Sequence, residues 1–328
     1  SELKSAFEEA GIKAIERDDA IYRAVGLSPT PLLQSPALLR ILERDYNATC
    51  GEWRNLTRTT ADEAQKLFLK EVDTAYRMTS SGAVSYTQAV RDAVDRIVKQ
   101  GVKVSYPSGR EMSIESATMM TVRTGISQCA GAIALKRMEE LEWDTILVSA
   151  HVGARIGDGG NNPTNHFWWQ GKFYSRTDKR FPDFRTSTGY GTVTGLCGVN
   201  CRHSFGSGDG ENNPYADINL SSEDNIKAEE RAKKQRLMER RIRNSKREIQ
   251  NLQTAIDASG DDKLKFELQQ AYDRKSAVLR RQNKQYREFC KENGLKEYSE
   301  RLRVAQWDRS QAVKSAKAAQ RYINSKEK

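Results

Sequence analysis

The 328-residue sequence has only three histidines and five cysteines, and it has no long apolar run. A small and odd number of cysteines does not suit a disulfide-stapled scaffold and favours a reducing compartment. No stretch approaches about 18 consecutive apolar residues, which excludes a transmembrane helix as a sequence-based expectation. Residues 1–4 begin an amphipathic helical pattern and lack the apolar core of a signal peptide.

Apolar residues are also scarce, since 37% of the chain is hydrophobic and 30% is charged. This apolar fraction is below that of an average globular protein, so part of the chain should not pack into a conventional core. The length predicts two domains, or one domain with an extension.

The net charge of +10 is concentrated at one end of the sequence. Residues 221–328 hold 28 Lys and Arg against 17 Asp and Glu, whereas residues 1–220 hold 26 against 27. A basic block of this kind indicates a polyanion partner, most often a nucleic acid. The alternative is the solvated face of a polar helical segment, and the composition alone leaves both open.

Residues 1–100 read as a helical N-terminal region. Ser35 followed by Pro36 predicts one helix start, and a capping-box pattern at residues 60–63 predicts another. A second capping box begins at Ser85, and Gly101 is the expected residue after that helix.

Residues 101–220 read as a small α/β module. The pattern predicts strands at 102–106 and 145–149, a turn at 107–109 and a helix at 114–141. The rest of this module is rich in Gly, Asn and aromatic residues, which is typical of loops built around a specific site.

Residues 221–328 read as a basic helical extension. Two narrow apolar stripes, one on each side of a turn at 257–262, predict an antiparallel helical hairpin or coiled coil. A break at Asn293 and Gly294 predicts a last helix through Leu302 and Trp307. The expected fold class is therefore α+β and mainly α-helical.

Histidine is as unevenly distributed as charge. All three histidines and two of the five cysteines lie within 53 residues: His151, His166, Cys197, Cys201 and His203. Thiolates and imidazoles are the ligands that Zn²⁺ prefers, four in a tetrahedron, so the cluster predicts a zinc site. Two other interpretations stay open. One is a hydrogen-bonded cluster without metal, and the other is a catalytic pair in which Cys201 is the nucleophile and His151 or His203 the base.

Short motifs extend over residues 10–300. The most specific are Ala-His-Val-Gly-Ala-Arg at 150–155, Trp-Gln-Gly-Lys at 169–172 and Gly-Leu-Cys-Gly-Val-Asn-Cys-Arg-His-Ser-Phe at 195–205. Together with residues 17–26 and 55–60, they resemble the phage minor capsid protein 2 family, which is related to the Mu-F-like head-morphogenesis proteins. Members of that family carry further helix before the point that corresponds to residue 1.

One segment departs from the family pattern. The family separates the two histidines of the first two motifs by only a few residues, whereas residues 156–165 widen this gap here with Gly and Asn. If His151 and His166 contact one metal or one partner, this insert has to loop out.

The resemblance implies a structural component of the virion head that lies inside the capsid near the portal and is assembled in the cytoplasm of the bacterial host. The implied partners are the portal protein, the major capsid protein and the packaged double-stranded DNA, and the implied role is in head assembly and in genome packaging or delivery. Lysines and arginines of the basic helices would contact phosphates without sequence preference. The candidate contacts are Lys233, Lys234, Arg236, Arg240, Arg241, Arg243, Lys246, Arg247, Arg280 and Arg281.

Two further hypotheses compete with a DNA-contacting head protein. The His/Cys module could be a Cys/His-dependent or zinc-dependent hydrolase or transferase, although the sequence shows no paired carboxylates and no complete triad. The C-terminal helices could instead mediate self-association, with the stripe from Leu237 to Ile256 facing another subunit.

Overall fold

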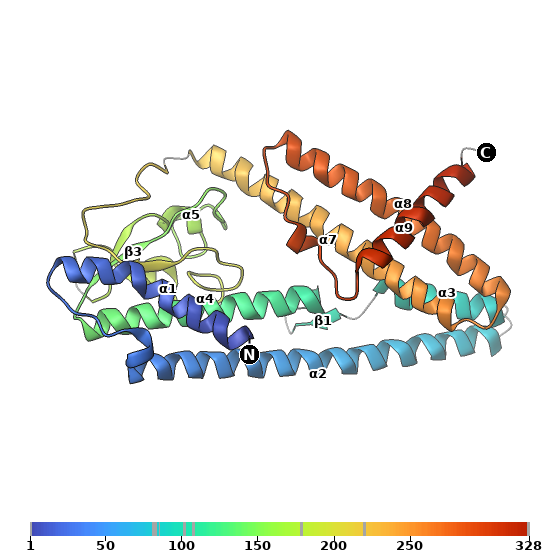
Figure 1. The fold of residues 1–328 in the computed structure, drawn as a ribbon, viewed down its shortest axis with the longest axis horizontal. Coiled ribbons are helices and arrows are strands. Elements are labelled where there is room, and N and C mark those ends of the chain that lie inside the picture. Colours follow the sequence, from blue (N-terminus) through green and yellow to red (C-terminus); the bar gives the residue numbers. More distant parts are fainter. Residues whose placement is uncertain are drawn as a thin grey trace. The chain divides into compact units, whose positions relative to one another are not determined.

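The computed structural model describes residues 2–80, 84, 86–100, 103–106, 109–177, 180–218 and 221–326 (Figure 1). The chain divides into two compact units: unit 1 comprises Ser1–Thr57 and Ser116–Glu230, and unit 2 comprises Arg58–Glu115 and Arg231–Lys328. The described part is 67% helical and carries two small sheets, which confirms the expected mainly α-helical α+β class. The division into three regions with boundaries at residues 100 and 220 stays a prediction from the sequence.

The helical part of unit 1 consists of α1 (Glu2–Ala24), a 3₁₀ helix (Leu32–Gln34), the first turns of α2 (Pro36–Ser80) and α4 (Ile114–Glu140). Ser35 caps α2, because its Oγ accepts a hydrogen bond from the Leu38 N–H at 3.3 Å, as the Ser-Pro pattern predicted. One apolar cluster holds these helices together: Phe7, Ile15, Leu32, Leu38, Leu42, Cys129 and Ile133.

The β part of unit 1 is a three-stranded antiparallel sheet with the order β4-β3-β5. Its strands are β3 (Thr145–Val148), β4 (Phe173–Ser175) and β5 (Phe205–Ser207), and all four residues of β3 are buried. Two short helices, α5 (His166–Trp169) and α6 (Phe184–Thr188), lie in the connections. A second apolar cluster, which includes Trp169, packs on this sheet.

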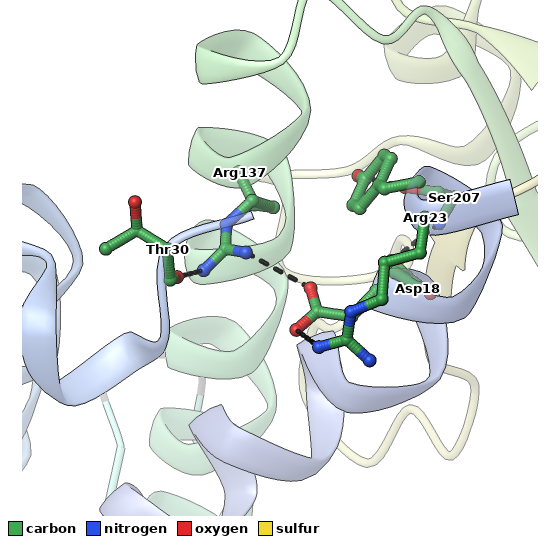
Figure 2. A network of polar contacts seen from close by, with 7 residues as sticks. Asp18, Arg23, Thr30, Arg137 and Ser207 are labelled. Carbon is green, nitrogen blue, oxygen red and sulfur yellow. Dashed lines mark hydrogen bonds and ion pairs between the residues drawn. The ribbon is translucent and has the colours of Figure 1, made fainter. Parts of the chain in front are cut away.

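A buried ion pair links α4 to α1 (Figure 2). Arg137 is 1% exposed, and its Nη1 donates to Asp19 Oδ1 at 3.1 Å. Its Nη2 donates to the carbonyl oxygen of Thr30, in the segment between α1 and α2. Arg23 lies on the other side of the carboxylate, with Nη2 3.7 Å from Asp19 Oδ2. The Arg137 guanidinium therefore fixes both the end of α1 and the chain that follows it.

The neighbouring carboxylate, Asp18, links α1 to β5. Asp18 Oδ2 accepts a hydrogen bond from the Ser207 N–H at 2.7 Å, and the Tyr22 hydroxyl is hydrogen-bonded to Ser207 Oγ. Only glycine fits at position 206, because a Cβ there would lie 2.5 Å from Asp18 Oδ1. Burial raises the pKa of Asp18 to about 6, against the opposing hydrogen bonds from Ser207.

This raised pKa makes a pH-dependent contribution to stability that Asp18→Asn should remove. The unfolded chain ionises Asp18 near pH 4, whereas the folded chain keeps the proton until about pH 6, so the free energy of unfolding falls as the pH rises between these values. We expect this loss to be roughly 3 kcal/mol. Urea unfolding of both proteins at pH 4 and pH 7 measures it, since other titrating groups cancel in the difference. Parallel pH profiles for the two proteins would contradict this assignment.

Unit 2 contains the helical hairpin predicted from the C-terminal sequence. Its elements are the rest of α2, α3 (Tyr86–Gln100), β1 (Lys103–Ser105) paired with β2 (Glu111–Ser113), most of α7 (Ser222–Ala258), α8 (Asp262–Glu292), a 3₁₀ helix (Ser299–Leu302) and α9 (Arg309–Lys326). The turn between α7 and α8 falls within the predicted 257–262, and Asp261 caps α8 by accepting from the Leu264 N–H at 2.7 Å. The orange and red ribbons of Figure 1 show α8 beside α7 and α9 crossing α8.

The apolar stripes of α7 and α8 bury each other within one chain. Ile242, Ile249, Leu252 and Ile256 of α7 share one cluster with residues of α8 and with Ala318 of α9. Leu237, at the start of the predicted α7 stripe, is 39% exposed. The hypothesis that this stripe faces another subunit is therefore wrong for its larger part, because its own chain covers it.

Two expectations about helix boundaries are wrong. α2 continues without a break through residues 60–63, because Thr and Ala are tolerated in a helix interior even where they form a capping-box pattern. The last helix does not pass through Leu302 and Trp307, since α9 begins at Arg309.

Some expected features lie outside the described residues. These are the N-cap at Ser85, the helix end at Gly101, the first residue of the strand at 102–106 and the first two residues of the turn at 107–109. Within the described residues, no helix combines the length and the apolar character needed to cross a membrane.

Candidate functional site

The His/Cys site of unit 1 is assembled from α5 and from the loop that enters β5. His166 is the first residue of α5, which begins there because Asn165 caps it through its side chain, accepting from the Trp168 N–H at 3.1 Å. Cys201 and His203 precede β5, so the antiparallel pairing of β5 with β3 fixes their position. The two segments bring His166 close to Cys201 and His203.

Three of the five predicted residues converge. Cys201 Sγ lies 3.8 Å from His166 Nδ1 and 3.7 Å from His203 Nδ1, and the three ligand atoms all lie within 4.8 Å of one another. His166 and His203 are each 2% exposed and Cys201 is 6% exposed. We call these three residues the His/Cys triad.

Hydrogen bonds fix the tautomers of both histidines. His166 Nε2 lies 2.8 Å from the carbonyl oxygen of Thr194, which can only accept, so Nε2 carries the proton. His203 Nε2 lies 2.9 Å from Gln170 Oε1, and the same oxygen accepts from the His151 N–H at 3.0 Å, which fixes the orientation of the amide. Both imidazoles therefore direct an unprotonated Nδ1 at Cys201.

The other two predicted residues lie beside the His/Cys triad and do not join it. The His151 ring stacks on the His203 ring with centroids 4.3 Å apart, while its Nδ1 is 3.1 Å from the carbonyl oxygen of Val152. Cys197 is buried, and its side chain is hydrogen-bonded to Ser127. Trp169 packs against both histidines of the triad, with its ring 4.5 Å from His166 and 4.7 Å from His203.

Burial keeps the site uncharged. Desolvation lowers the pKa of His166 to about 4 and that of His203 to about 2, so both rings are neutral at pH 7. Desolvation also raises the pKa of the Cys201 thiol. A buried, protonated thiol is a poor nucleophile, so the raised pKa of Cys201 does not favour the hypothesis of a catalytic cysteine.

Arg155 lies in one of the sequence motifs, but the motif did not indicate its role. It holds the loop backbone in place. Arg155 Nη2 donates to the carbonyl oxygen of Val199 at 3.0 Å, and Nη1 donates to that of Thr194 at 3.4 Å. The Thr194 carbonyl is the group that holds His166, so Arg155 supports the His/Cys triad through the loop backbone. Gln170 supports the triad in a similar way, through its hydrogen bond with His203, and it also lies in one of the sequence motifs. No feature of the sequence indicated the role of Thr194.

The insert at residues 156–165 forms an exposed loop, although only His166 of the two histidines that flank it joins the His/Cys triad. Asp158 accepts from the Gly160 N–H at 3.0 Å and from Asn162 Nδ2 at 2.7 Å, so the loop closes on itself. Asn165 Nδ2 donates to the carbonyl oxygen of Gly160 at 2.9 Å and ties the loop to the start of α5. The longer connection therefore leaves His166 in place.

The ten candidate DNA contacts of unit 2 fall into distinct environments. Arg243 is only 7% exposed and donates to the carbonyl oxygen of Arg301 at 2.5 Å. Lys246 is half-buried, donates to the carbonyl oxygen of Leu302 at 2.7 Å and lies over the Trp307 ring. These two residues anchor the segment after α8. Arg236 and Arg247 are also partly buried, and six candidates are exposed: Lys233, Lys234, Arg240, Arg241, Arg280 and Arg281.

Two of the exposed arginines line one groove. A groove of about 360 Å³ between α7 and α8 is lined by Met238, Arg241, Val278, Arg281, Gln282 and Gln285, and we call it the basic groove. None of these six residues, all within the described part of the chain, is acidic. Among the other exposed candidates, Lys234 lies over the Phe289 ring and Arg280 donates to Gln320 Oε1 at 2.7 Å.

The division into units sharpens the charge asymmetry of the sequence. Unit 2 holds 36 Lys and Arg against 21 Asp and Glu, a net charge of +15, whereas unit 1 holds 18 against 23, a net charge of −5. The positive charge thus belongs to one compact unit, and the His/Cys triad belongs to the other.

These features define a mainly helical α+β protein with a buried His/Cys site and a separate basic helical unit. The chain belongs to the phage minor capsid protein 2 family, whose model matches residues 1–291, and the resemblance predicted from the motifs is confirmed. The protein is therefore a structural component of a phage head, found in the virion and associated with other phage structural components. No curated protein and no solved structure matches the chain.

Proposed function

We propose that this head protein lies inside the capsid near the portal and contacts packaged double-stranded DNA through unit 2. Family membership supports a place in the head, and the charge of unit 2 supports contact with a polyanion. The portal protein and the major capsid protein are its proposed protein partners, and its proposed role is to assist head assembly and the packaging or delivery of the genome.

The basic groove carries the DNA part of this proposal. Arg241 and Arg281 come from different helices and line the same groove, and none of its lining residues is acidic, so an anion bound there could contact both guanidinium groups. Guanidinium groups pair with phosphate oxygens in two-pronged hydrogen bonds. Gln282 and Gln285 add side-chain amides that can donate to further phosphate oxygens.

Contacts to phosphates give affinity without reading base sequence, which suits a protein that meets every part of a packaged genome. Arg243 and Lys246 are left out of the proposed contact set, because both hydrogen-bond to backbone carbonyls of their own chain. The exposed residues on α7 and α8, chiefly Arg240, Arg241, Arg280 and Arg281, form the proposed contact face.

The test measures binding of the full chain to duplex DNA. Fluorescence anisotropy monitors the binding at several salt concentrations. The full chain is used because unit 2 includes Arg58–Glu115 as well as the basic helices. We expect binding without sequence preference, and an affinity that falls steeply as salt rises. The double variant Arg241→Ala/Arg281→Ala should weaken binding and reduce the slope of log K against log salt by about 2.

A matched control removes the same charge from unit 1. Lys4 and Lys13 are exposed lysines on α1, so Lys4→Ala/Lys13→Ala lowers the net charge equally without touching unit 2. This control should bind DNA with nearly the wild-type slope. Absence of salt-sensitive binding, or an equal effect of the two double variants, would overturn the proposed DNA contact.

A further inference from the structure

The His/Cys triad contains more hydrogen-bond acceptors than its one thiol proton can satisfy. Two imidazoles direct lone pairs on Nδ1 at Cys201 Sγ, and a thiol has one proton to donate. The tautomers cannot be exchanged to relieve this, because both Nε2 atoms face oxygens that only accept. One buried acceptor would thus remain without a donor, which is unfavourable.

A metal cation bound by all three atoms removes this mismatch. We propose that the His/Cys triad binds one Zn²⁺ through His166 Nδ1, Cys201 Sγ and His203 Nδ1. This inference is independent of the proposed DNA contact, because the triad and the basic groove belong to different units.

The two sulfur–nitrogen distances are close to those of a tetrahedral zinc site. Zn–S bonds of about 2.3 Å and Zn–N bonds of about 2.0 Å, at the tetrahedral angle, place sulfur and nitrogen about 3.5 Å apart. The two sulfur–nitrogen distances in the triad are 3.8 Å and 3.7 Å. The two Nδ1 atoms lie within 4.8 Å of each other and have to approach to about 3.3 Å, so binding of the ion requires the two rings to move toward it.

The surroundings hold the ligands as a metal site requires. Each ligating histidine of a metal site typically donates its second ring N–H to a carbonyl or carboxylate, which fixes the ring and raises its basicity. His166 donates its second ring N–H to the carbonyl oxygen of Thr194, and His203 donates its own to Gln170 Oε1. Trp169 packs against both rings and restricts their movement.

The donor set favours zinc over the hard cations. One thiolate with two imidazoles suits Zn²⁺, whereas Mg²⁺ and Ca²⁺ prefer oxygen ligands. Zinc binding replaces the thiol proton, which leaves to solvent, so that Cys201 coordinates as the thiolate. The three side chains occupy three tetrahedral positions, and a water molecule completes the fourth. The ion would join α5 to the loop before β5 and so add its binding free energy to the stability of unit 1.

The first measurement is the metal content of the untagged full chain after loading with Zn²⁺ and gel filtration. We expect roughly one zinc per chain and no comparable amount of copper or iron. Loading with Co²⁺ should give a sulfur-to-metal charge-transfer band in the near ultraviolet, because a thiolate is among the ligands. This spectrum uses the wild-type chain and so does not depend on whether a variant folds.

The variants assign the ligands. Cys201→Ser and His203→Gln should each lose at least nine-tenths of the bound zinc, and Cys201→Ser should also lose the charge-transfer band. Cys197→Ser is the matched control, because Cys197 is a buried thiol of the same loop but lies outside the triad, and it should keep both. A wild-type chain that binds no zinc, a cobalt spectrum without the thiolate band, or a Cys201→Ser chain that retains the metal would each overturn the proposal.

Discussion

Replacing Arg137 by Met should destabilise unit 1 by about 3–5 kcal/mol, the usual effect of breaking a buried ion pair. The substitution keeps an apolar stem of similar length but leaves Asp19 with only the 3.7 Å contact to the exposed Arg23. It also deprives the carbonyl oxygen of Thr30 of its donor. Urea unfolding at pH 7 measures the loss.

The neighbouring residue supplies the control for this substitution. Lys136 pairs with Glu139 at 3.1 Å on the surface of the same helix, so Lys136→Met should change the free energy of unfolding by less than about 1 kcal/mol. The double variant Asp19→Leu/Arg137→Met should recover part of the loss, since no buried charge is then left unpaired. A cost below about 1 kcal/mol for Arg137→Met would contradict the importance of this ion pair.

Trp169→Ala should be comparably severe, with a cost of about 3–5 kcal/mol. Trp169 is fully buried, its Nε1 donates to the carbonyl oxygen of Pro163 at 3.0 Å, and its ring packs on both histidines of the triad. Truncation leaves a large cavity beside the site and an unpaired carbonyl. Thermal and chemical unfolding of the full chain both report this loss.

Trp168→Ala is the control, because Trp168 is adjacent in sequence but only partly buried, with Lys172 over its ring at 5.6 Å. We expect this variant to lose about 1 kcal/mol. Trp169→Phe should lie between the two, since it fills most of the space but cannot donate to Pro163. Equal costs for Trp168→Ala and Trp169→Ala would contradict the packing described for α5.

Local signals in the sequence predicted much of the helical framework. Ser35 with Pro36 marked the true start of α2, and the apolar stripes of α7 and α8 marked a real hairpin, because capping and helical periodicity act over a few residues. The pattern at residues 60–63 misled for the same reason: capping residues are tolerated inside a helix whose tertiary contacts continue. The last helix was predicted too early in the chain, because α9 packs through small residues such as Ser315, Ala318 and Ala319, which carry no large apolar signal.

The site shows what residue identity alone leaves undetermined. The sequence grouped five His and Cys residues correctly in one region, but it could not tell that His151 stacks on His203 or that Cys197 hydrogen-bonds elsewhere. Side-chain direction in a loop depends on backbone hydrogen bonds such as those of Arg155 to Thr194 and Val199. The basic helices show the same limit, since periodicity did not reveal that Arg243 points to a carbonyl of its own chain.

The proposed contact between unit 2 of this head protein and packaged DNA can be measured in the virion itself. The most direct measurement is ultraviolet cross-linking of intact virions, with identification of the peptides that carry nucleotide adducts. We expect adducts in peptides of α7 and α8, concentrated around Arg240, Arg241, Arg280 and Arg281. The proposed contact would be contradicted if the adducts were confined to peptides of unit 1, or if this protein carried no adducts in intact virions.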